Sequence, residues 1–152
     1  MRKAQILVLL LAGCGGEGGE TPAREPVQTE TLTGLYRTGD SDRPSQLCIV
    51  ARGGEERFGL ATWFEGRPRC SGAGAAERRG DVLRLVMAGE EACVIEASLN
   101  RTIVTFPRSV PPGCAYYCAP GASFAGRQFE KVGGSEADAL RARDLVGDAL
   151  CG

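Results

Sequence analysis

Short runs in which every second residue is apolar cover much of the chain between residues 31 and 134. They span residues 46–51, 57–64, 81–87, 92–99, 101–106 and 127–132. A period of two places alternate side chains on opposite faces of a β-strand. Gly, Pro, Asp and Asn residues typical of turns separate the runs. The pattern predicts a mainly β domain over residues 31–134, a small antiparallel meander that closes as a barrel or folds as a sandwich.

The run at residues 46–51 is apolar on both of its faces. Leu47 and Ile49 lie on one face of the expected strand, and Cys48 and Val50 lie on the other.

Two stretches interrupt the alternation. Residues 70–80 are mostly small, and they fit either a bulged strand, where backbones approach closely, or a flexible loop. In residues 110–126, Pro111 and Pro112 exclude a central strand.

Cys114 and Cys118 of this second stretch leave two arrangements open. Lying one helical turn apart, they bond to two different strands, or they bond to each other around a small loop. Tyr116 and Tyr117 between them either form a binding surface or cover the edge of a core.

Residues 135–152 carry the signals of an α-helix docked on the β domain. Ser135 is a candidate N-cap, and Asp138 follows three residues later, close to a capping box. Cys151 would attach the helix to the β domain through a disulfide. The expected apolar stripe consists of Ala139, Ala142, Val146, Ala149 and Leu150.

The N-terminus has the layout of a targeting segment. Arg2 and Lys3 precede an apolar run at residues 6–11 that is too short to span a bilayer. The run leads into Leu11-Ala12-Gly13-Cys14, which resembles the lipobox of bacterial lipoprotein precursors. The resemblance implies a signal peptide at residues 1–13.

The same resemblance implies lipidation of Cys14. Its sulfur would receive a diacylglyceryl group, cleavage would follow Gly13, and the new amine would be acylated, with palmitate among the acyl groups. Gly15 rather than Asp after the cysteine implies sorting to the outer membrane of a Gram-negative cell, with the domain facing the periplasm. Residues 14–30 are rich in Gly, Pro and Glu and are expected to form a flexible tether.

The cysteine count agrees with export. The sequence has seven cysteines, and lipidation of Cys14 leaves an even set of six. In an oxidising compartment an even set predicts three disulfides, although the sequence does not choose among the fifteen pairings. With no His in the chain, we expect neither a metal nor a cofactor. The six cysteines are Cys48, Cys70, Cys93, Cys114, Cys118 and Cys151.

Charge gives little indication of a partner beyond the membrane. Loss of Arg2 and Lys3 with the signal peptide leaves 16 basic and 19 acidic residues, a net charge of -3. That balance predicts no nucleic-acid partner. Four arginines either form a basic patch for lipopolysaccharide or an acidic partner, or are merely solvated. They are Arg67, Arg69, Arg78 and Arg79.

Catalysis is not expected. The absence of His excludes a Ser–His nucleophile, and no carboxylate lies in a recognisable catalytic motif. The expectation is a non-catalytic binding module on a lipid anchor. Its layout is loosely similar to that of periplasmic protease and lysozyme inhibitors, a resemblance that implies inhibition of an envelope or host hydrolase. Two alternatives are a passive structural lipoprotein and a barrel that binds a small apolar ligand.

Overall fold

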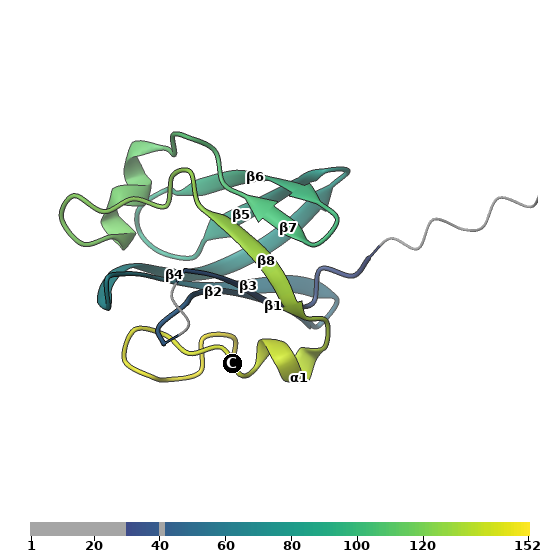
Figure 1. Ribbon diagram of the computed structural model, residues 1–152. Helices are drawn as coiled ribbons and strands as arrows, with labels where there is room; N and C mark the ends of the chain where they lie inside the picture. Colours follow the sequence, from purple (N-terminus) through teal and green to yellow (C-terminus); the bar gives the residue numbers. More distant parts are fainter. Residues whose placement is uncertain (1–29, 40–41) are drawn as a thin grey trace, which may run out of the picture.

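The computed structural model describes residues 30–39 and 42–152. Within these residues, eight antiparallel strands form a closed barrel in which each strand pairs with the next and β8 pairs with β1 (Figure 1). The mainly β prediction is confirmed, and of its two forms the barrel is correct. The strands are β1 (Gly34–Thr38), β2 (Ser45–Arg52), β3 (Glu55–Phe64), β4 (Arg67–Arg79), β5 (Val82–Met87), β6 (Val94–Asn100), β7 (Ile103–Thr105) and β8 (Gln128–Gly133).

The small-residue stretch at 70–80 lies largely in β4, so its interpretation as a strand is correct. Small residues are needed where β4 meets β5. A Cβ atom at Gly74 would overlap the carbonyl oxygen of Val86 and lie 2.9 Å from the amide nitrogen of Ala88. Glycine therefore allows the two backbones to approach at this point.

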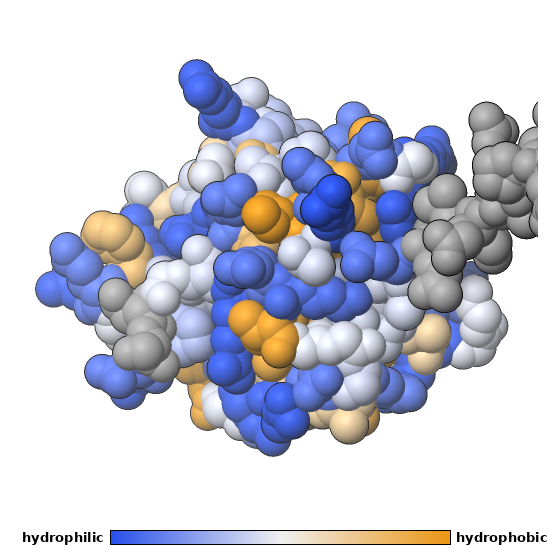
Figure 2. Space-filling view, turned by 45° about the vertical axis from the view of Figure 1, so that its right-hand side comes forward, coloured by the Kyte–Doolittle hydropathy of each residue, from blue (hydrophilic) through white to orange (hydrophobic). Residues whose placement is uncertain are grey.

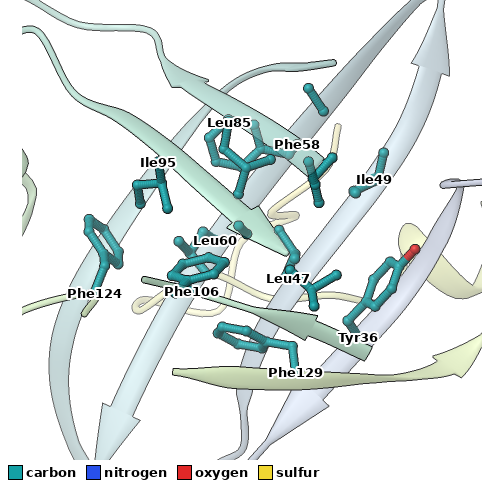
Figure 3. Close-up of a cluster of buried hydrophobic side chains, with 14 of the residues drawn as sticks. Tyr36, Leu47, Ile49, Phe58, Leu60, Leu85, Ile95, Phe106, Phe124 and Phe129 are labelled. Atoms are coloured by element: carbon teal, nitrogen blue, oxygen red, sulfur yellow. The ribbon is translucent and has the colours of Figure 1, made fainter. Parts of the chain in front are cut away.

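Side chains fill the interior of the barrel (Figure 3). Leu47 and Ile49 of β2 point into this core, as the alternation predicted. The rings of Phe106 and Phe129 pack with their centroids 5.3 Å apart. A barrel of eight strands is just wide enough for side chains to fill it.

The connections β1–β2, β3–β4, β5–β6 and β7–β8 all lie at one end of the barrel, which we call the loop end. The longest of them, residues 106–127, contains a 3₁₀ helix at Pro112–Tyr117 and buries Phe106 and Phe124 in the core. Two disulfides hold it, Cys70–Cys118 and Cys93–Cys114. Of the two arrangements that the sequence left open, the one with separate partners is therefore correct.

The described chain enters at the opposite end. Leu32 is buried there, and the Tyr36 hydroxyl donates a hydrogen bond of 2.8 Å to its carbonyl oxygen. The Lys131 ammonium donates to the carbonyl of Thr31 at 2.6 Å. Burial raises the pKa of Tyr36 to about 12, and the carboxylate of Glu56 adds to the rise. These contacts fix the point at which the chain joins the barrel.

The C-terminal helix is much shorter than predicted. It spans only Glu136–Ala139, and Ser135 and Asp138 form the expected capping box at its start. The hydrogen bonds from Ser135 hold the pKa of Asp138 below its usual value. The prediction of a helix over 135–152 is therefore wrong beyond Ala139, although its first turn is confirmed.

A turn around Asp144 replaces the rest of the expected helix. The Asp144 carboxylate accepts hydrogen bonds of 2.9 Å from the amides of Val146 and Asp148. An Asp side chain that bonds to the backbone in this way competes with helical hydrogen bonding. Gly147 has a φ of 97°, which favours glycine. The chain reverses here, and Val146, expected on the buried stripe, is 82% exposed.

Residues 136–152, which we call the tail, pack on the outside of β1–β3 (Figure 1). The outward-facing Cys48 and Val50 of β2 form a second core with Ala139 and Ala142 of the tail. The Cys48–Cys151 disulfide closes this core. Both faces of β2 are thus buried, which explains why its sequence is apolar on both.

Candidate binding cleft

An open cleft of about 500 Å³, which we call the arginine cleft, lies at the loop end, between the barrel and the tail. One wall comes from β1, β2, β3 and residues 42–44, which precede β2. The other wall comes from the turn of the tail. The lining residues that matter most are Arg37, Arg43, Trp63, Arg141, Arg143 and Asp144.

Trp63, the only tryptophan of the sequence, is held at the edge of this cleft. Ser45, which is buried, accepts a hydrogen bond of 2.9 Å from the Trp63 amide. The β3–β4 register shifts directly before Trp63, which leaves Arg69 of β4 as an extra, bulged residue. Bulges of this kind redirect side chains at the rims of barrels. The backbone of Trp63 is therefore held in place, and its ring is half-buried.

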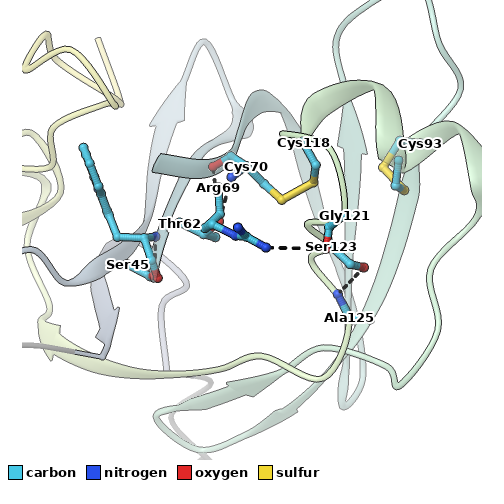
Figure 4. The surroundings of a disulfide bond; sticks show 11 residues. Ser45, Thr62, Arg69, Cys70, Cys93, Cys118, Gly121, Ser123 and Ala125 are labelled. Atoms are coloured by element: carbon cyan, nitrogen blue, oxygen red, sulfur yellow. Dashed lines mark hydrogen bonds between the residues drawn. A yellow bond between two sulfur atoms is a disulfide. The ribbon is translucent and has the colours of Figure 1, made fainter. Parts of the chain in front are cut away.

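A disulfide stabilises the strands next to Trp63. The hydroxyl of Thr62 accepts a hydrogen bond of 2.9 Å from the amide of Cys70, which is bonded to Cys118 (Figure 4). Arg69 reaches across to the carbonyl of Gly121 at 3.4 Å. These contacts tie the β3–β4 corner to the long connection 106–127.

Four arginines give the cleft its positive character. The Arg143 guanidinium donates to the carbonyls of Leu140 and Ala142, each at 3.1 Å. Arg141 pairs with Asp138 at 2.6 Å. Arg37 and Arg43 form no ion pair with any described residue. Among the described residues, no carboxylate neutralises the guanidinium groups of Arg37 and Arg43, so both can bind an anionic ligand.

Arg43 also contacts the aromatic ring of the cleft. Its guanidinium carbon lies 5.2 Å from the centroid of the Trp63 ring, within the range of a cation–π interaction. A carboxylate that binds Arg43 would therefore lie beside the indole. Asp42 and Asp144 also line the cleft, so its field is positive but mixed.

A second pocket of about 300 Å³ lies on the other side of Trp63 and contains Arg127 and Phe64. Burial and the charge of Arg69 lower the pKa of Arg127. The buried Nε of Arg127 has no hydrogen-bond partner among the described residues. Phe64 is 57% exposed at the same rim. Arginine side chains therefore lie on both sides of Trp63 at the loop end, and Phe64 adds a second aromatic ring on one side.

Tyr116 and Tyr117 differ in their surroundings. The sequence left open whether they form a binding surface or cover the edge of a core. The Tyr117 hydroxyl donates to the carbonyl of Glu91 at 2.8 Å, and its ring packs against the core. Tyr116 is 62% exposed, and its ring meets that of Tyr117 edge to face. Both line a groove that shares Leu145 with the arginine cleft. Tyr117 covers the core edge, whereas Tyr116 extends the exposed surface.

The basic patch considered for Arg67, Arg69, Arg78 and Arg79 does not form. The two pairs lie at opposite ends of β4, a strand of 13 residues, so about 30 Å of extended chain separates them. Arg78 donates to the carbonyls of Gly80 and Glu30, and Arg79 pairs with Glu77. Only Arg67 and Arg69 belong to the loop end.

Some of the remaining predicted sites lie within the described residues and others lie outside them. All six cysteines of the predicted framework are paired in three disulfides. Cys14, the predicted lipidation site, lies outside the described residues, as do the signal peptide and nearly all of the tether. Among residues 30–39 and 42–152, no helix is long and apolar enough to cross a bilayer, and no group of potential ligands gathers to hold a metal ion.

The arginine cleft was not predicted from the sequence. Arg37 and Arg143 stand more than a hundred residues apart and meet only because the tail folds back over β1 and β2. One signal was available, a lone tryptophan on the same face of its strand as the small residues Gly59 and Ala61. Comparison with protein-family models, with curated proteins and with solved structures gave no match.

Proposed function

We propose that this protein is a non-catalytic binding module of the bacterial envelope that recognises a protein partner through its loop end. In this proposal a lipid on Cys14 anchors the module to the outer membrane and residues 15–30 are the tether. The proposal rests on the half-buried Trp63, whose backbone amide is held by Ser45, beside Arg37 and Arg43, which form no ion pair with any described residue.

The composition of the surface supports a protein partner. Trp, Tyr and Arg are the side chains most enriched at the centres of protein interfaces. Trp63, Tyr116 and Arg43 lie along two adjoining concave surfaces at the loop end. Elsewhere, on the face drawn in Figure 2, apolar side chains are scattered singly among hydrophilic ones. Single exposed apolar residues are ordinary on a soluble domain.

The filled interior argues against the alternative of a small apolar ligand inside the barrel. Phe106, Phe124 and Phe129 occupy the interior together with aliphatic side chains (Figure 3). A ligand would have to displace this core, whose close packing contributes to stability.

The direction of the loop end also fits the proposal. The described chain enters the barrel beside Leu32, and the loop end lies at the other extremity (Figure 1). On a tether attached to Cys14, the cleft would point away from the membrane. The disulfides that hold the loops reduce the entropy lost on binding. A rigid end of this kind suits an inhibitor of an envelope or host hydrolase, the partner class that the resemblance to periplasmic inhibitors implies.

The test is affinity capture with a matched variant. The purified protein, with its disulfides intact, is immobilised beside Trp63→Ala and the distant control Val82→Ala. Proteins bound from an envelope extract are quantified by mass spectrometry. We expect at least one protein to bind the wild type and the control but not Trp63→Ala. Identical capture by all three proteins would contradict the proposal.

A further inference from the structure

We infer that the arginine cleft binds an exposed acidic peptide segment of the partner protein, in which carboxylates pair with Arg37 and Arg43 and a neighbouring apolar side chain packs on Trp63. This inference rests on the proposed function and adds the chemistry of the ligand.

The charge of the cleft favours an anionic ligand. The whole chain has a net charge of -1, yet the described lining of the cleft places four guanidinium groups against the carboxylates of Asp42 and Asp144. A further carboxylate, that of Asp138, pairs with Arg141. The other three arginines of the cleft form no ion pair with any described residue. One carboxylate, that of Asp144, is already bonded to two backbone amides of the turn. A guanidinium matches a carboxylate with two parallel hydrogen bonds. Arg37 and Arg43 are the groups best placed to form such pairs.

The apolar part of the lining decides between anionic ligands. Trp63, Leu145 and the exposed Val146 border the same cleft as the arginines. A peptide segment offers carboxylates and apolar side chains a few ångströms apart. A phosphate-rich glycolipid head group offers negative charge without an adjoining apolar side chain to pack on Trp63, Leu145 and Val146. The mixed lining therefore favours a peptide.

The cleft is also preorganised. Ser45 holds the backbone of Trp63, and the capped turn around Asp144 holds the opposite wall. The Arg143 side chain is fixed by two carbonyls of its own turn. Few side chains other than Arg37 and Arg43 would need to be ordered when the segment binds, and this lowers the entropic cost of association.

The experiment uses the fluorescence of Trp63, because the sequence has no other tryptophan. The purified protein with intact disulfides is titrated with a capped decapeptide that carries Glu-Leu-Glu at its centre and Gly and Ser elsewhere. The comparison peptide has Gln in place of both Glu residues. We expect a saturable change in emission with the acidic peptide, at least tenfold tighter binding than for the Gln peptide, and weaker binding as salt is raised.

Variants locate the site. We expect Arg43→Gln and Arg37→Gln each to weaken binding of the acidic peptide about tenfold, since hydrogen bonds to charged groups are the stronger kind. Arg79→Gln makes the same change of charge on an exposed arginine that pairs with Glu77 away from the cleft, and it should bind like the wild type. Circular dichroism confirms that each variant is folded.

Several outcomes would overturn the inference. The acidic peptide could give no saturable signal, or the Gln peptide could bind equally well. Arg79→Gln could weaken binding as much as Arg37→Gln and Arg43→Gln do. Lipopolysaccharide vesicles or inorganic phosphate could bind in preference to the peptide. If the peptide fails while capture of a partner still depends on Trp63, the proposed function stands and only the ligand chemistry falls. If both fail, the proposed function falls as well.

Discussion

Leu150 lies directly on the backbone of Gly59. A Cβ atom at position 59 would overlap the carbonyl oxygen of Leu150 and lie 2.8 Å from its Cγ. Because Gly59 of β3 has no side chain, the end of the tail can reach the barrel next to the Cys48–Cys151 disulfide. The tail also forms one wall of the arginine cleft. The contact between Gly59 and Leu150 therefore helps to position this wall, although neither residue lines the cleft.

We expect Gly59→Ala to destabilise the protein by about 1–3 kcal/mol, the usual effect of overpacking. The contact that must give way is partly backbone, so a change of side-chain rotamer cannot relieve it. Thermal denaturation followed by circular dichroism measures the loss, and Trp63 emission reports the shift of the tail.

Gly134→Ala is the matched control, because no atom lies within 4 Å of a Cβ at that position. Equal midpoints of denaturation for the two alanine variants would show that the tail does not press on Gly59.

The Cys48–Cys151 disulfide should stabilise the tail more than the barrel. We expect the double variant Cys48→Ala/Cys151→Ala to lose about 2–4 kcal/mol of stability, to expose the tail to proteases and to lose binding of the acidic peptide. The far-UV spectrum should keep its strand signature, because the interior core does not include either cysteine.

Cys93→Ala/Cys114→Ala provides the comparison. This bond spans 21 residues, whereas Cys48–Cys151 spans 103. Cys93–Cys114 holds the connection 106–127 and not the tail. We therefore expect that its removal leaves the tail protected from proteolysis. Tail cleavage at the same rate in both double variants would contradict this assignment.

The strands were largely predictable because their signal is local. Period-two alternation and turn residues suffice to place β2, β3, β5 and β6. The sequence also predicted a C-terminal element docked on the β domain, and this layer covers Cys48 and Val50 on the outer face of β2. The layer itself was misjudged, because Ser135 and Asp138 are helix signals and the following Ala, Leu and Arg residues favour a helix.

The tail and the cleft depend on interactions that are not local. The Asp144 turn and the bond to Cys48 outweigh the helix propensity of residues 140–150, and neither is visible as a period in the sequence. The cleft needs the register of β1–β3 and the path of the tail together. Nothing in the sequence therefore distinguished Arg37 and Arg143 from other surface arginines, and only the lone Trp63 gave a signal.

Lipidation of Cys14 is a prediction that stands on the lipobox. We expect Cys14→Ser to abolish labelling by a palmitate analogue and to leave an unprocessed precursor of higher mass. Cys151→Ser is the control, because it removes a cysteine without touching the lipobox and should be labelled normally. Labelling of the Cys14→Ser protein, with cleavage after Gly13, would refute the prediction.

Stability at alkaline pH should depend on Tyr36. Its pKa is raised from 10.0 to about 12 in the folded protein, first by burial and then by the charge of Glu56. The fold thus favours the neutral phenol, and this contribution is complete below pH 10 and is lost as the pH rises through 12. The midpoint of denaturation by urea should therefore fall between pH 10 and pH 12.

Tyr36→Phe separates this phenol from the other groups that titrate in the same range. At pH 8 the variant should be less stable by about 1–3 kcal/mol, because the carbonyl of Leu32 loses its buried donor. It should also lose less stability than the wild type between pH 10 and pH 12, so the two curves converge. Tyr116→Phe removes an exposed phenol and should follow the wild type throughout. Parallel curves for Tyr36→Phe and the wild type would mean that the neutral phenol of Tyr36 does not contribute to the fold.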